Sequence, residues 1–132
     1  LTLENTDFLV PANDANYQVD TYSIALSEDA ILESISPLMH SRGKRISIER
    51  ILKNGLRETI FNMPNYNYNW QMTYRLAEPM NLQAGTILHA TTVYDNSLAN
   101  PFNLAPDSAT TKGPTDNDET LTHYFRLLKK SN

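Results

Sequence analysis

Apolar and polar residues alternate in short runs along most of this chain, and this pattern constrains the fold more than any other feature. Within 121–127 every second residue is Leu, His, Phe or Leu, and Thr, Tyr and Arg lie between them. Residues two apart on an extended strand face the same side, so this run predicts a strand with one buried face. Alternation or a β-branched composition predicts further strands over 17–26, 30–40, 46–48, 70–76 and 86–94.

Turn-forming residues separate these runs. Asn54-Gly55 lies between two apolar segments and gives the strongest hairpin signal in the chain. Clusters of Pro, Asn, Asp and Gly divide the other runs, and the longest predicted loop is 95–118. Many short strands with turn signals between them predict an all-β fold, namely an antiparallel β-sandwich that is jelly-roll-like.

Length and composition limit the classes of protein that remain. The 132 residues fit one β-sandwich domain over 1–132, with a core predicted at about 8–128. The chain begins at Leu1 without Met, so we expect it to be a fragment of a larger protein. A net charge of −4 without a basic stripe argues against a nucleic-acid partner, and no apolar run reaches the roughly 18 residues of a membrane span. The absence of cysteine excludes disulfides, thiolate metal sites and cysteine nucleophiles.

Three histidines are the candidate metal ligands, but their spacing forms no ligand pair. The chain contains no His-x-His, His-x-x-x-His or HExxH arrangement. His123 and His89 share predicted strand faces with apolar residues, so we expect packed structural roles for both. His40 follows an apolar strand and is expected at the strand end.

Two charged segments are predicted to be solvated. The acidic residues Asp116, Asp118 and Glu119 lack the spacing and the glycine of an EF-hand, so a solvated loop is expected rather than a calcium site. The basic turn 42–45 could meet an anion, but a solvated hairpin end is the favoured interpretation.

Aromatic residues suggest one further kind of site. Tyr66, Tyr68 and Trp70 could together form a stacking platform for a sugar. The favoured interpretation, however, is that Trp70 packs in the core and one or both tyrosines lie at the surface. From the residues alone, the chain is a β-sandwich whose function stays open.

Several segments, taken in order, resemble one family. Residues 37–44 (Pro-Leu-Met-His-Ser-Arg-Gly-Lys) resemble a Pro-His-x-His-x-Arg-Gly-Lys motif, and 63–71 resemble Val-Pro-x-Tyr-Asp-Phe-Asn-Trp-Gln. Residues 94–103 resemble an Asp-Asn-Ser-x-x-Asn-Pro-x-Asn-Pro loop, and 118–119 fall where Asp-Glu-Met would lie. Over roughly 8–126 the chain is therefore similar to the C-terminal domain of the copper type II ascorbate-dependent monooxygenases, in particular the bacterial relatives of peptidylglycine alpha-hydroxylating monooxygenase.

The resemblance implies a monooxygenase C-terminal-domain type of sandwich and a copper that meets oxygen and substrate. Its copper ligands would be the two histidines of His-x-His and the methionine of Asp-Glu-Met, a donor set that suits Cu(I). Here the first position is Leu38, the second is His40 and the third is Thr120. Met39 is expected to point to the opposite side of the strand. The resemblance also places Tyr124 in the wall of a substrate pocket.

These departures favour one function and leave two alternatives open. We expect a non-catalytic structural or interaction module, with no cofactor bound tightly and with other domains of its own precursor as partners. The first alternative is a functional half of a copper-dependent C–H hydroxylating monooxygenase with altered ligands, which would act on an unknown small molecule or peptide. Its copper would bind where His40 joins His89 or His123. The second is a carbohydrate- or ligand-binding β-sandwich. By resemblance alone, we expect a periplasmic or extracellular location.

Overall fold

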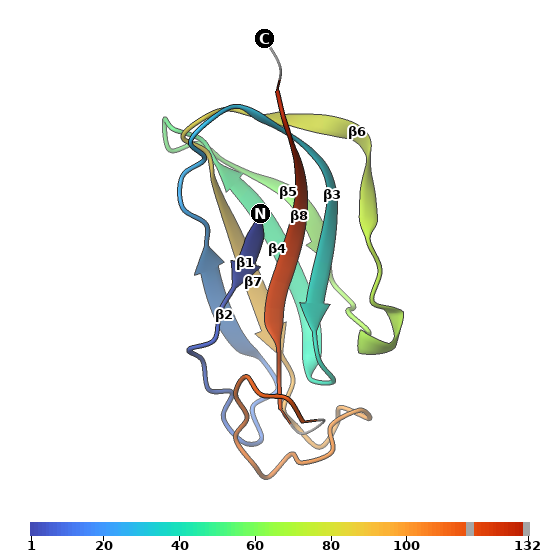
Figure 1. The fold of residues 1–132 in the computed structure, drawn as a ribbon. Coiled ribbons are helices and arrows are strands. Elements are labelled where there is room, and N and C mark those ends of the chain that lie inside the picture. The colour runs from blue at the N-terminus through green and yellow to red at the C-terminus, as the bar shows by residue number, and fades with distance from the viewer. Residues whose placement is uncertain (116–117, 131–132) are drawn as a thin grey trace.

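The computed structural model describes residues 1–115 and 118–130, and its regular structure is almost entirely β (Figure 1). Two antiparallel sheets of four strands face each other, and the only helical element among the described residues is a short 3₁₀ turn, η1 (Tyr68–Trp70). The strands are β1 (Thr2–Glu4), β2 (Tyr17–Tyr22), β3 (Ala30–Met39), β4 (Gly43–Ile51), β5 (Arg57–Met63), β6 (Tyr74–Leu82), β7 (Ile87–Tyr94) and β8 (Leu121–Lys129). The predicted all-β, two-sheet fold is therefore confirmed.

The chain crosses between the two sheets at almost every connection. Sheet A has the order β1-β8-β3-β6, and sheet B has the order β2-β7-β4-β5. Only the β4–β5 hairpin joins neighbours within one sheet. Its turn contains Asn54-Gly55, and Gly55 adopts a φ of 89°, which glycine reaches without steric cost. Crossing connections of this kind are typical of sandwiches with long-range antiparallel pairing.

Inward-facing residues of both sheets form one core. Ile35 and Met39 of β3 and Phe125 of β8 meet Ile48 of β4 and Leu88 of β7, and all of them are buried. The alternation within 121–127 therefore predicted the buried face of β8 correctly. The N-terminal segment contributes as well, because β1 pairs with β8 and places Leu3 in the core.

Two predicted strands differ from the observed ones. The strand expected over 17–26 ends at Tyr22, and Ile24 beyond it is 84% exposed. The strand expected over 70–76 begins only at Tyr74, because η1 interrupts the alternation. The Asn67 side chain accepts a hydrogen bond from the Asn69 amide and so favours a turn over an extended strand. No helix within the described ranges is long and apolar enough to cross a membrane.

Candidate functional site

The three positions that the resemblance assigns to copper ligands converge at one end of sheet A. Leu38 pairs with Thr122 across β3 and β8, and the ladder ends with the pair of Met39 and Leu121. His40 and Thr120 follow directly where the two strands meet. Their backbone N–H groups donate to the same Glu119 oxygen, Oε1, at 2.8 Å and 3.3 Å. Glu119 therefore holds the backbone of residues 40 and 120 together at this end of sheet A.

The side chains at this site do not fit a copper ion. Leu38 offers only an alkyl group, and the Thr120 hydroxyl is a hard donor that binds Cu(I) weakly. Met39 is fully buried in the core on the other face of β3, as expected from alternation, so its thioether faces away from the site. His40 alone supplies an imidazole. Its Nδ1 is buried and has no hydrogen-bond partner among the described residues, whereas a metal-bound imidazole ordinarily donates its second N–H to an acceptor.

The other two histidines lie elsewhere and are already engaged. His123 of β8 is fully buried between the sheets, where Nδ1 accepts from the Leu38 amide at 3.2 Å and Nε2 lies 3.0 Å from Thr92 Oγ1. Its position confirms the packed role expected for it. Burial lowers the pKa of His123 from 6.5 to about 4, because the charged imidazolium would be desolvated there.

His89 lies on sheet B and takes part in a polar cluster on its outer face. Nδ1 is 2.7 Å from Glu49 Oε1, Nε2 is 2.8 Å from Asp20 Oδ1, and the ring stacks on Tyr22 with centroids 4.2 Å apart. The hydrogen bond with His89 holds the pKa of Glu49 below its usual value. A joint site of His40 with His89 or His123 is therefore not formed. No group of three or more His, Asp or Glu side chains in the described ranges is arranged to hold a metal ion.

A buried polar network beside His40 is the feature that the sequence analysis missed. Glu119 is fully buried, and its Oε2 accepts from the Arg42 backbone N–H at 3.0 Å and lies 3.6 Å from Arg42 Nη1. Arg42 is 1% exposed and donates through Nε to Asn96 Oδ1 at 2.9 Å. Burial raises the pKa of Glu119, and hydrogen bonds to the backbone oppose that rise.

This network corrects two predictions. Arg42 is not part of a solvated basic turn, and Glu119 is not part of a solvated acidic loop, because each finds its partner in the other. Asp118 hydrogen-bonds to Thr115 within the loop, and Asp116 lies outside the described residues. The network also anchors the long loop that begins at residue 95, since Nδ2 of the Asn96 side chain donates to the carbonyls of residues 11 and 108 at 3.0 Å and 2.9 Å.

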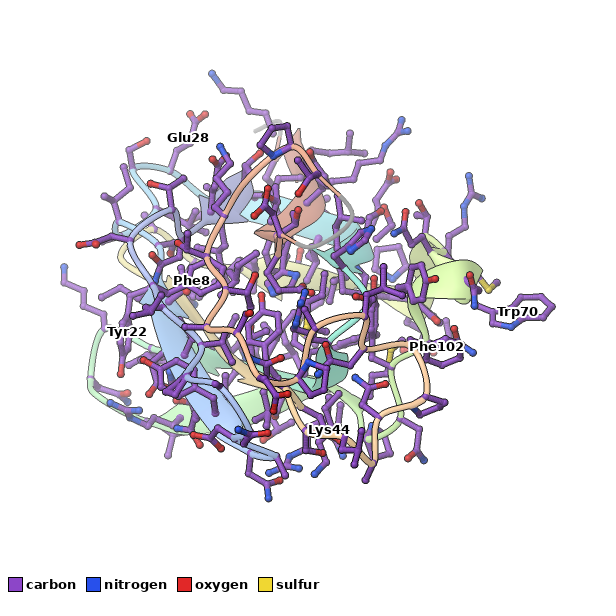
Figure 2. The ribbon with its side chains drawn as sticks, turned by 90° about the horizontal axis from the view of Figure 1, so that it is seen from below. Phe8, Tyr22, Glu28, Lys44, Trp70 and Phe102 are labelled. Atoms are coloured by element: carbon purple, nitrogen blue, oxygen red, sulfur yellow. The ribbon has the colours of Figure 1, made fainter. Side chains whose placement is uncertain are left out.

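The aromatic residues 66–70 do not form a shared platform. Tyr66 is buried, and its hydroxyl both accepts from the Met39 amide at 3.1 Å and donates to the Met39 carbonyl at 2.8 Å. Trp70 is 69% exposed and projects away from the body of the molecule (Figure 2), so its predicted place in the core is wrong. Since η1 breaks the alternation, Trp70 no longer shares a face with the residues of β6.

Tyr68 instead joins a small cavity beside His40. Its ring lies 5.3 Å from the His40 ring and 5.4 Å from the ring of Phe102, which belongs to the long loop. These rings, with Ser41 and Leu104, line a cavity of about 160 Å³. Tyr124, the expected pocket-wall residue, lies on the outer face of sheet A at 48% exposure, opposite Ser36.

Comparisons with known proteins assign no family to this chain. No protein-family model matches the sequence, and no curated protein matches it. The resemblance to the copper monooxygenases therefore rests on the motifs quoted above alone.

Proposed function

We propose that this chain is a non-catalytic structural or interaction module built on the scaffold of a monooxygenase C-terminal domain. The observation that carries the proposal is the convergence of Leu38, His40 and Thr120 at one end of sheet A. The three positions lie near one another, but the donors expected at two of them are missing. One imidazole does not hold copper tightly.

The buried network supports the same proposal. Glu119 and Arg42 fasten the ends of β3 and β8 through hydrogen bonds, so this corner needs no metal to keep its shape. In this proposal the natural partners are other domains of the same precursor, and the location is periplasmic or extracellular. Both of these statements follow from the resemblance.

Anaerobic titration with Cu(I) against a competing chelator tests the proposal. We expect only weak binding by the wild-type chain, and no change when His40→Ala is compared with His89→Ala, a matched histidine on the other sheet. Tight one-to-one binding that His40→Ala abolishes would overturn the proposal. It would favour the alternative, the functional half of a copper-dependent monooxygenase with altered ligands.

A gain-of-binding variant tests the scaffold type separately. Leu38→His combined with Thr120→Met restores an imidazole and a thioether at the two positions that lack them. If the scaffold is of the proposed type, the double variant should bind one Cu(I), and adding His40→Ala should weaken that binding. A double variant that is folded by circular dichroism but binds no copper would contradict the proposed type.

A further inference from the structure

Strand β3 loses register with both of its neighbours at the same point. Its pairing with β8 shifts between Leu32 and Ser34, and its pairing with β6 shifts at the same place. In the pairing of β3 with β6, Leu32 of β3 pairs with Met80 of β6, and Ser34 pairs with Arg75. Residues 76–79 of β6 therefore all lie opposite one residue of β3, Glu33. Figure 1 shows the sharp bend of β6 beside β3. Bulges that disrupt a ladder in this way are common beside functional sites.

A cavity occupies the place where the ladder opens. Its volume is about 330 Å³, at the lower end of the roughly 300–1,000 Å³ typical of small-molecule sites. The displaced segment supplies an apolar wall through Leu76 and Pro79. The Thr73 hydroxyl, 2.8 Å from Ser36 Oγ, adds a polar group at the rim.

The charges at this cavity favour an anion. Arg75 and Arg126 both line it, and Glu33 is its only acidic lining residue. Glu33 Oε2 contacts Arg126 Nε at 3.0 Å, which fixes the direction of that guanidinium; its terminal nitrogens have no partner among the described residues. Arg75 makes no ion pair within the part of the chain that the structure describes. The lining therefore carries a net charge of +1 in a chain of −4.

We propose that this cavity binds a small organic oxyanion, a carboxylate or a phosphate monoester attached to an apolar group. A guanidinium presents paired N–H donors that match the oxygens of a carboxylate or phosphate. Arg75 and Arg126 hold the oxyanion, and Leu76 and Pro79 contact the apolar part of the ligand. The site shares no residue with the His40 corner, so it goes beyond the proposed function and does not depend on it.

Titration calorimetry at low salt with benzoate, phenyl phosphate and benzamide tests the proposal. Benzoate or phenyl phosphate should bind at one site, and the stronger of the two identifies the source of the oxyanion. Benzamide has the same ring without the charge and should bind at least tenfold more weakly, because a charge-assisted hydrogen bond contributes about one decade in affinity or more. Amide chemical-shift changes should cluster in 33–36 and 73–79.

Two variants distinguish anion binding in this cavity from a general effect of the protein's charge on anion affinity. Arg75→Gln should weaken anion binding about tenfold and keep the melting temperature, since the side chain is exposed. Arg45→Gln removes the same charge from an exposed position on sheet B and should leave the affinity unchanged. Equal losses in both variants, equal binding of benzamide and benzoate, or no saturable binding would each overturn the proposal.

Discussion

Acid should destabilise this protein through the buried His123. The ring is fully buried, and Nδ1 accepts a hydrogen bond from the Leu38 amide. The tautomer that does so carries its proton on Nε2, where it donates to Thr92 Oγ1. Protonation would place a second N–H against the Leu38 amide and would bury a charge with no acid beside it.

The sign and size of the effect follow from the two pKa values. The folded state has a pKa of about 4 at His123 and the unfolded state has 6.5, so the unfolded chain binds the proton first as the pH falls. The contribution of His123 to stability is fully present above pH 6.5 and is lost as the pH falls toward about 4. Between about pH 7.5 and about pH 4.5 the loss is about 2 to 3 kcal/mol.

Urea unfolding at a series of pH values, followed by far-ultraviolet circular dichroism, measures this loss. Trp70 is largely exposed, so its fluorescence would report the transition poorly. With a slope of about 2 kcal/mol per molar urea, the midpoint should fall by about 1 M or slightly more over this range. His123→Gln is the reference, because its amide can accept from Leu38 and donate to Thr92 without titrating.

The prediction is tested by the difference between the stability–pH profiles of the wild type and His123→Gln. Glu119 acts in the opposite direction, because its raised folded pKa makes acid stabilising as the pH falls through that value toward 4.5. The lowered pKa of Glu49 adds stability that is lost as the pH falls below 4.5. Both terms are common to the two proteins and cancel. Parallel profiles for wild type and His123→Gln would refute the reasoning.

Three substitutions test the packing of the site region by thermal or urea unfolding. Arg42→Met should cost about 3–5 kcal/mol, because it leaves the buried Glu119 carboxylate without its cation; a loss below 1 kcal/mol would contradict the importance of that pair. Gly43→Ala should cost more than 1 kcal/mol, because an added Cβ would lie 2.7 Å from both the Tyr66 ring and the Met39 Cβ; an unchanged melting temperature would mean that both neighbours shift without cost. Trp70→Ala should change stability by no more than about 0.5 kcal/mol, and a larger loss would mean that the exposed indole packs on the domain.

The sequence predicted those elements in which local pattern and tertiary packing agree. The hairpin at Asn54-Gly55 and the alternating faces of β4 and β8 are in this group, because a glycine with positive φ and a period of two are local properties. The segment 70–76 failed because its alternation continues that of β6 in phase. A single Asn67 side-chain hydrogen bond creates a turn there, and the hydrophobic pattern contains no sign of it.

The polar network could not have been predicted from local pattern. Arg42 and Glu119 are 77 positions apart, and each lies in a segment rich in polar and turn-forming residues. Such segments are normally solvated, so the expectation of exposure was reasonable for each taken alone. Only the pairing of β3 with β8 brings the two together, and that pairing is a property of the whole topology.

Under the proposed function, the network would explain why the motif near residues 37–44 persists without its metal ligands. The residues that carry the resemblance near the site include Arg42, Gly43 and Glu119, and all three shape the backbone: Glu119 accepts from both strand ends, and Gly43 allows the close approach of Tyr66. Leu38 and Thr120, the positions that depart from the motif, are not among the buried core residues. In the proposed scaffold a change at either position would remove a ligand without opening the core or leaving a buried charge unpaired. Packing would therefore preserve the motif even where the metal chemistry is absent.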